Sequence, residues 1–224
     1  RGWLDKALWT LPALTGVHFP ADPRTAQLTK NLRAQYPAVS PDGESIAFVR
    51  IGADGAALAL SDRDGGNVRE LLRFDDTTQL YTPRWSPDGR RIAVSWSLAG
   101  QRDIGLIEVE GSGVLEPLII STGTDRDPTW SADGTELLFV SDVSGVFNVY
   151  ALDMVSGAIE QVTNVRGGAF FPTANAAGDI IYSGYGTDGF SLHKIARAEA
   201  TQVDAALFTS GRRGLWEQAP VAAA

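Results

Sequence analysis

The chain has 224 residues, 44% apolar and 21% charged, which is typical of a folded globular protein and excludes an intrinsically disordered one. Its formal charge of -8 disfavours binding to a phosphate backbone, and the nearest basic feature, Arg212 with Arg213, is interpreted as solvated surface. The absence of cysteine excludes disulfides and thiolate metal sites, and no apolar run approaches the roughly 18 residues of a membrane span.

The first 31 residues contain two segments with the apolar content of strands, LDKALWTLPALTG and RTAQLTKN. The chain begins at Arg1 without the basic and apolar regions of a secretory signal peptide. We therefore expect a processed chain, or a segment of a longer one.

Four related segments follow, each with a proline, a tight turn and an apolar strand. Their sequences are YPAVSPDGESIAFVR, YTPRWSPDGRRIAVSW, RDPTWSADGTELLFVS and FFPTANAAGDIIYSGY. The prolines Pro37, Pro83, Pro128 and Pro172 lie 46, 45 and 44 residues apart. A period of about 40 to 50 residues with short strands is typical of β-propeller blades.

Further apolar stretches after each turn predict that every copy is a four-stranded antiparallel meander. The predicted fold is an all-β propeller of about 4–6 blades in a single domain, 1–224. It consists of a half blade at 1–31, four repeats at 32–76, 77–122, 123–165 and 166–204, and a divergent tail at 205–224. Either the tail closes the ring by completing the half blade, or a partner covers the open edges.

The recurrent turns are interpreted as structural, because an active site is needed once and a turn is needed in every blade. Aspartate caps backbone amides there and glycine supplies a positive φ. The predicted turn residues are Asp42, Gly43, Asp88, Gly89, Asp133, Gly134 and Gly178. Trp85 and Trp130, one residue before the turn, are predicted to pack between blades.

The motif PRWSPDGRRIAV, together with NVYALD and QVTN, resembles the Pro-Asp type repeats of the TolB-like propeller family. This resemblance implies a protein-binding propeller of the bacterial periplasm or cell envelope. Related repeats form the substrate-gating propellers of prolyl-oligopeptidase-like and tricorn-like peptidases. The segments TNVRGGAFFP and YSGYGTDGF also resemble the propeller part of large bacterial envelope proteins.

No catalytic or metal site is predicted. Ser45 lies in the only approach to a Gly-x-Ser-x-Gly elbow, but Arg91 and Glu136 replace it in other copies. The SDRDGGN stretch fits no calcium-loop frame, and two separated histidines serve zinc poorly. His193 is assigned to a strand in which Leu192 and Ile195 are expected to be buried.

The connections between blades are expected to gather at one face, around the channel. They carry the predicted partner-binding residues Tyr36, Tyr81, Arg126, Asp127, Arg166, Phe170 and Phe171. Asp125, Arg126 and Asp127 are expected to form local ion pairs.

The predicted function is a non-enzymatic scaffold without cofactors that binds other proteins of an envelope or membrane assembly, and no nucleic acid. The alternatives are a peptidase-gating propeller and a propeller that binds a small ligand or metal.

Overall fold

The computed structural model describes residues 26–197, 201–202 and 206–209. The chain divides into two compact units, residues 1–30 and 31–224. In the first unit only residues 26–30 are described, and they form no helix or strand. The predicted half blade therefore lies almost entirely outside the described residues.

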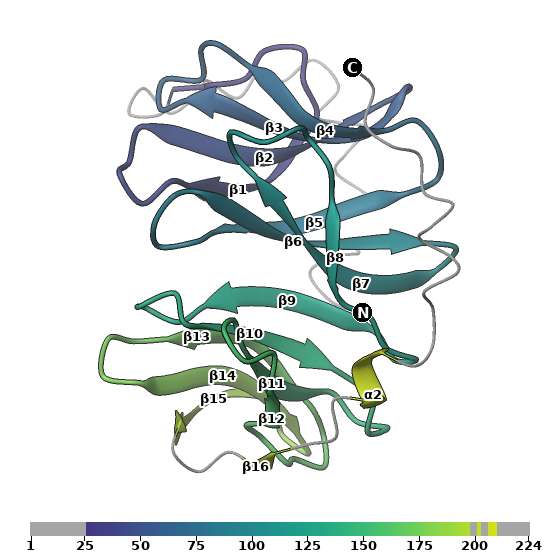
Figure 1. Cartoon of the computed structure of the whole chain (residues 1–224), viewed down its shortest axis with the longest axis vertical. Helices are drawn as coiled ribbons and strands as arrows, with labels where there is room; N and C mark the ends of the chain where they lie inside the picture. Colours follow the sequence, from purple (N-terminus) through teal and green to yellow (C-terminus); the bar gives the residue numbers. More distant parts are fainter. Residues whose placement is uncertain (1–25, 198–200, 203–205, 210–224) are drawn as a thin grey trace, which may run out of the picture. The chain divides into compact units, whose positions relative to one another are not determined.

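The second unit contains four antiparallel sheets, labelled here sheets A to D in chain order (Figure 1). Sheet A contains β1 (Ala34–Val39), β2 (Ser45–Gly52), β3 (Gly55–Asp62) and β4 (Arg69–Phe74). Sheet B contains β5 (Gln79–Trp85), β6 (Arg91–Leu98), β7 (Gln101–Glu108) and β8 (Glu116–Ile119). Sheet C contains β9 (Asp125–Trp130), β10 (Glu136–Ser141), β11 (Asn148–Asp153), β12 (Ile159–Gln161) and β16 (Thr201–Gln202). Sheet D contains β13 (Ala169–Ala174), β14 (Asp179–Gly186) and β15 (Gly189–Ala196).

Successive sheets pack face to face through three apolar clusters. Val49 of sheet A and Ile92 of sheet B belong to the first cluster, and Ile104 of sheet B and Phe139 of sheet C belong to the second. The third joins sheets C and D. Consecutive residues in the middle of β6 and β10 are buried, as expected for strands with both faces covered. The predicted all-β propeller architecture is confirmed.

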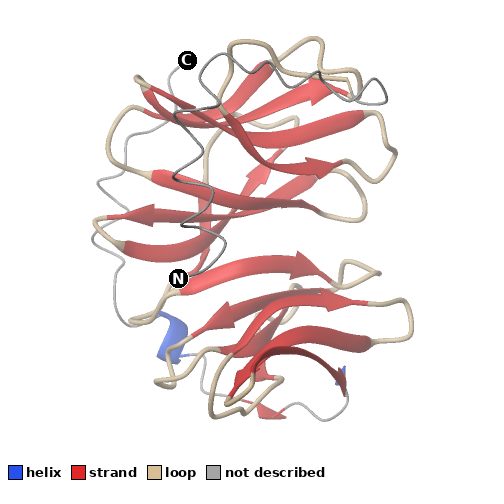
Figure 2. Cartoon of the chain, turned by 180° about the vertical axis from the view of Figure 1, so that it is seen from behind, coloured by secondary structure: helices blue, strands red, loops and turns tan. Residues whose placement is uncertain are grey.

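Sheet D differs from the predicted four-stranded meander. Among the described residues it has three strands, and residues 201–202 pair with β12 of sheet C as β16 (labelled in Figure 1; Figure 2 gives the view from behind). The described part of the predicted tail forms the helical turn α2 (Ala206–Thr209). Phe208 is buried there against Phe139 and Tyr150, with ring centroids 5.5 and 5.3 Å away. These four residues therefore pack on sheet C and are not a strand of the first blade.

Hydroxyl and carboxylate groups brace the turn between the first two strands of each of sheets A to C. In sheet B, the hydroxyl of Ser86 donates to Asp88 Oδ1 at 2.5 Å and accepts from the Arg91 amide at 2.9 Å. The Ser86 hydrogen bond lowers the pKa of Asp88. Asp42 and Asp133 make the same bond to the serine two residues before them. Gly43, Gly89, Gly134 and Gly178 all have φ between 70° and 83°, where glycine avoids steric strain.

The turn in sheet D is one residue shorter than the other three, because Ala174 pairs with Ile180 whereas Trp85 pairs with Ile92. Asn175 Oδ1 accepts hydrogen bonds from the Ala177 and Asp179 amides, both at 2.9 Å. The asparagine thus replaces the aspartate as acceptor for the amide after the glycine, and Gly178 still adopts the positive φ of the other turn glycines.

Two tryptophan indoles connect neighbouring sheets. Trp85 Nε1 donates to the Ala38 carbonyl of sheet A at 3.0 Å, and Trp130 Nε1 donates to the Arg84 carbonyl of sheet B at 3.1 Å. Both acceptors lie one residue before the position in the preceding sheet that corresponds to the tryptophan. Each indole therefore fixes the inner strands of two successive blades against each other.

The first strand of each sheet, called its inner strand below, has a bulge at the residue before its proline. These inner strands are β1, β5, β9 and β13. Tyr36, Thr82, Asp127 and Phe171 have φ between 46° and 54°, and the strand register shifts at the same place in all four sheets. A left-handed non-glycine residue costs on the order of 1 kcal/mol or more, and the residue before proline normally avoids helical backbone angles. Packing on both sides of the bulge must offset this cost in every blade.

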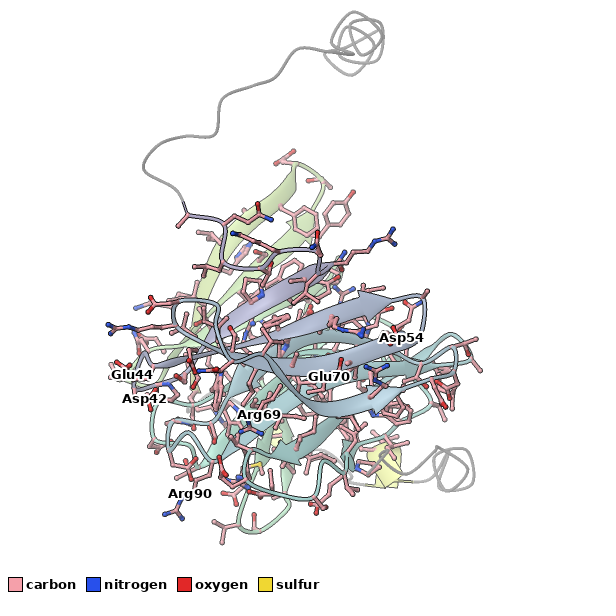
Figure 3. The ribbon with its side chains drawn as sticks, turned by 90° about the horizontal axis from the view of Figure 1, so that it is seen from above. Asp42, Glu44, Asp54, Arg69, Glu70 and Arg90 are labelled. Carbon is pink, nitrogen blue, oxygen red and sulfur yellow. The ribbon has the colours of Figure 1, made fainter. Side chains whose placement is uncertain are left out.

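A closed ion-pair network lies at one end of sheet A. Arg50 pairs with Asp54 and Glu70, both at 3.0 Å, and Arg73 pairs with the same two carboxylates. Figure 3 shows Asp54 at this end of the sheet and Asp42 at the opposite, turn end. These four charges therefore neutralise one another.

Within the described part of the chain, no helix has the length and apolar character needed to cross a membrane.

Candidate partner-binding surface

The bulged ends of the inner strands carry a continuous row of aromatic and arginine side chains. We call it the inner-strand surface and define it by Tyr36, Tyr81, Arg102, Arg126 and Phe171. All five are at least partly exposed; four lie on or beside the bulges, and Arg102 lies on β7, where it reaches the ring of Tyr81.

Tyr81 lies at the centre of this row. Its ring centroid is 6.0 Å from that of Tyr36, and the Arg102 guanidinium carbon lies 3.6 Å from the ring centroid. Its hydroxyl donates to Gln79, two residues earlier on the same face of β5. A cation over an aromatic face is attracted by the ring quadrupole, so Arg102 and Gln79 together hold the orientation of the ring.

Arg102 belongs to this surface but was not among the residues predicted from the sequence. Ser97 of β6 pairs with Gln79 of β5 on one side and with Arg102 of β7 on the other. This register places the three residues in one row across sheet B. The only signal in the sequence was the length of the hairpin after β6, which sets that register.

Two hollows adjoin Tyr81. The first, with a volume of about 380 Å³, lies between sheets A and B and is lined by Tyr36, Ile51, Leu80 and Tyr81 among others. The second, of about 550 Å³, extends toward sheet C and is lined by Tyr81, Arg102, Thr124 and Arg126 among others. One hollow thus offers apolar contact and the other offers cations, with Tyr81 as their shared wall.

Arg126 and Phe171 extend the surface to sheet D. The guanidinium carbon of Arg126 lies 5.8 Å from the centroid of Phe171, whose side chain is 57% exposed. Asp127 binds Arg126 Nε at 2.9 Å but is only 6% exposed. Asp127 therefore holds the guanidinium of Arg126 in place through a buried ion pair and exposes little of its own side chain to a partner.

Phe170 and Arg166 complete the predicted set. Phe170 is half-buried, with its ring 5.3 Å from Phe147 of the preceding sheet and 6.4 Å from Phe171. Arg166 is exposed in the connection between sheets C and D. Phe170 thus packs against Phe171, and within the described part of the chain no contact joins Arg166 to the inner-strand surface.

Asp125 does not form the predicted ion pair. Its side chain is fully buried, and neither carboxylate oxygen has a hydrogen-bond partner among the described residues. It pairs with Ser141 in the strand register, whereas Arg126 is the next residue and points to the opposite face. Alternation along the strand therefore separates the two charges.

Burial raises the pKa of Asp125 to about 7. The hydroxyls of Ser141 and Ser121 lie near enough to lower the pKa in part, although neither makes a well-aligned hydrogen bond to the carboxyl group, and the carboxylates of Asp103 and Asp142 raise it further. Near neutral pH the carboxyl group is therefore divided between its neutral and charged forms.

Sheet D also brings a serine and a histidine together. Ser191 Oγ and His193 Nε2 are 2.8 Å apart on β15, and the imidazole stacks on Tyr182 with centroids 5.3 Å apart. A nucleophilic pair needs a third group to orient the base, and no carboxylate hydrogen bond to His193 is found in the described residues. We therefore interpret the contact as a hydrogen bond between two polar side chains on one face of β15, not as a catalytic pair.

Leu192, expected to be buried, is 79% exposed. Leu192 and Ile195 are three residues apart, so they point to opposite faces of β15, and only Ile195 packs against the core. No group of three or more histidine, aspartate or glutamate side chains in the described ranges is arranged to hold a metal ion.

Comparison with known proteins was decisive for the family. The family model of the TolB beta propeller domain matches residues 25–223. The chain belongs to this family. The resemblance stated from its repeats is thereby confirmed.

Two curated relatives are similar in sequence to part of this TolB-type chain. An uncharacterized protein of Agrobacterium fabrum is 31% identical over 170 residues, which cover 72% of this chain and 55% of that protein. The Tol-Pal system protein TolB of Francisella tularensis subsp. holarctica is 30% identical over 108 residues, covering 47% and 24%. The chain thus spans about half the length of the first relative and a quarter of the second.

Solved structures show the same fold. TolB from Acinetobacter baumannii matches with a TM-score of 0.66 and 20% identity, covering 78% of this chain and 44% of that one. A puromycin-hydrolyzing peptidase of Mycobacterium tuberculosis matches with a TM-score of 0.63 and 15% identity, covering 79% and 29%. At such identities the likeness concerns the fold alone.

Proposed function

We propose that this TolB-type propeller is a non-enzymatic binding platform for other proteins of a bacterial cell-envelope assembly, and that its partner docks on the inner-strand surface. Family membership and a relative named as a Tol-Pal system protein support the class of function. The observation that carries the location is the row of aromatic and arginine side chains at the bulged strand ends.

The composition of this surface suits a protein partner. Tyr36 and Phe171 are 38% and 57% exposed, and tyrosine and arginine are enriched among residues that dominate binding energy. Each lies on or beside a strained inner-strand bulge, and strain of this kind clusters at functional sites. The side chains are held on strands and so lose little freedom on binding.

Site-specific photo-crosslinking tests the location. A photoreactive phenylalanine analogue is placed at Phe171, and the chain is irradiated in an envelope extract of its own organism. The matched control carries the analogue at Val155, which is 91% exposed in the turn after β11. We expect a discrete protein adduct from position 171 and none from position 155. Equal labelling from both positions, or none from either, would contradict the proposal.

The non-enzymatic part of the proposal has its own test. The likeness to a peptidase concerns its fold, and the Ser191 and His193 pair is the nearest approach to a nucleophile and base in the described residues. We expect no hydrolysis of a nitrophenyl ester above the rate of heat-unfolded protein. Hydrolysis that Ser191→Ala abolishes would refute this part.

A further inference from the structure

The larger hollow beside Tyr81 is a cationic site in an acidic protein. Two arginines, Arg102 and Arg126, line it together with hydroxyl and amide groups, and no carboxylate is among its lining residues. The chain as a whole carries a formal charge of -8. A positively charged hollow is unexpected on a protein with a net negative charge, and solubility alone does not account for it.

Arg102 differs in its contacts from Arg50 and Arg73 of sheet A. Arg50 and Arg73 each bind two carboxylates in the network of sheet A. Arg102 has a tyrosine ring against its guanidinium, and no carboxylate among the described residues lies within ion-pairing distance of it. Contact with the ring leaves the edge of the guanidinium, with its N–H donors, available to a planar acceptor.

Arg126 supplies a second cation to the lining of the same hollow. Its ion pair with Asp127 uses Nε and holds the guanidinium in place from the buried side. Thr124, immediately before β9, adds a hydroxyl to the lining. A carboxylate between these walls would receive charge-assisted hydrogen bonds, which are roughly twice as strong as neutral ones.

We infer that the inner-strand surface recognises an acidic, extended segment of its protein partner, with a carboxylate between Arg102 and Arg126 and a neighbouring apolar side chain in the hollow beside Tyr36. This rests on the proposed function and names the chemistry of the partner. The two hollows share Tyr81 as a wall, so adjacent residues of one segment can occupy both. Asp76 is the one carboxylate residue among those that line the apolar hollow, and its charge disfavours a second acidic group there.

Fluorescence anisotropy with a defined probe tests the inference. The probe is a terminally blocked, labelled peptide in which glutamate alternates with serine around one leucine, and its control has glutamine for every glutamate. We expect the acidic probe to bind at least about tenfold more tightly than the control, and Arg102→Gln to remove about tenfold of its affinity. Binding should weaken as salt is raised, because screening reduces charge attraction.

The matched variant is Arg90→Gln, which makes the same change of charge at the turn end of sheet B, the end that carries Asp42 in sheet A (Figure 3). It should leave probe affinity unchanged. Equal binding of the two probes, or equal loss with Arg90→Gln and Arg102→Gln, would overturn the inference. Circular dichroism confirms that both variants remain folded.

The outcomes separate this inference from the proposed function. If the acidic probe fails while the adduct at position 171 still forms, the surface binds a protein but not through a carboxylate. If neither is seen, both proposals fail. If the acidic probe prevents formation of the adduct at position 171, the peptide and the protein partner bind to the same surface.

Discussion

At the scale of single residues, Asp125 is a carboxyl group that the fold buries without a hydrogen-bond partner. Its pKa is raised to about 7, chiefly by burial, from an ordinary value near 3.8. As pH rises between these values, the unfolded chain releases the proton while the folded chain keeps it. The free energy of unfolding therefore falls over this range and levels off above it.

Replacing this carboxyl group with an amide removes its contribution to the pH dependence of the free energy of unfolding. We expect Asp125→Asn to raise the free energy of unfolding at about pH 8, by an amount on the order of 4 kcal/mol at most, and to leave it unchanged below about pH 4. Urea unfolding of both proteins across this pH range measures the difference, in which the other carboxylates cancel. A difference between the two curves that is independent of pH would contradict the raised pKa.

At the scale of elements, some buried tryptophans form a hydrogen bond between two sheets and others contribute only apolar packing. Trp130 and Trp96 are both buried, at 7% and 3% exposure, but only Trp130 has an acceptor for its indole, the Arg84 carbonyl. Trp96 Nε1 has none among the described residues. The same substitution at the two positions therefore isolates the hydrogen bond between sheets B and C.

We expect Trp130→Phe to lower the free energy of unfolding by about 1 kcal/mol or more beyond the loss caused by Trp96→Phe. Both variants lose similar apolar volume, but only the first leaves a carbonyl without its donor. Chemical denaturation of the two variants gives the comparison. Equal losses would show that the inter-blade hydrogen bond contributes nothing net.

Most of the elements could be predicted from the sequence, because turn residues and alternating apolar positions are local signals. The SPDG turns and the strands after them follow from such signals. Arg102 could not be predicted as part of the surface, since its contact with Tyr81 depends on the register of three strands. Asp125 was assigned to an ion pair because adjacency in sequence was taken for adjacency in space, whereas strand alternation points it into the core. That sheet D has only three strands in the described ranges could not be predicted either, because no local signal marks the end of a sheet.

At the scale of the whole second unit, stability is a sum over neighbouring blades, as in other repeat proteins. Sheets B and C each pack against a sheet on both sides through the apolar clusters. Sheet D is covered by sheet C on one face, while Phe190 and Leu192 on β15 are 65% and 79% exposed. Local opening should therefore begin at sheet D.

Hydrogen exchange can measure this difference on equivalent strands, because β11 and β15 are both third strands of their sheets. The core of β11 is buried between β10 and β12, whereas β15 pairs only with β14 among the described residues. We expect amides of β15 to exchange on the order of a hundredfold faster than those of β11, with alternate residues protected where they bond to β14. Tyr182→Ala should accelerate exchange in β14 and β15 and leave β2 and β3 unchanged, since sheet A shares no cluster with Tyr182. Equal protection of β11 and β15 would mean that the open edge of sheet D is covered in solution, and blade-by-blade opening would then be the wrong description.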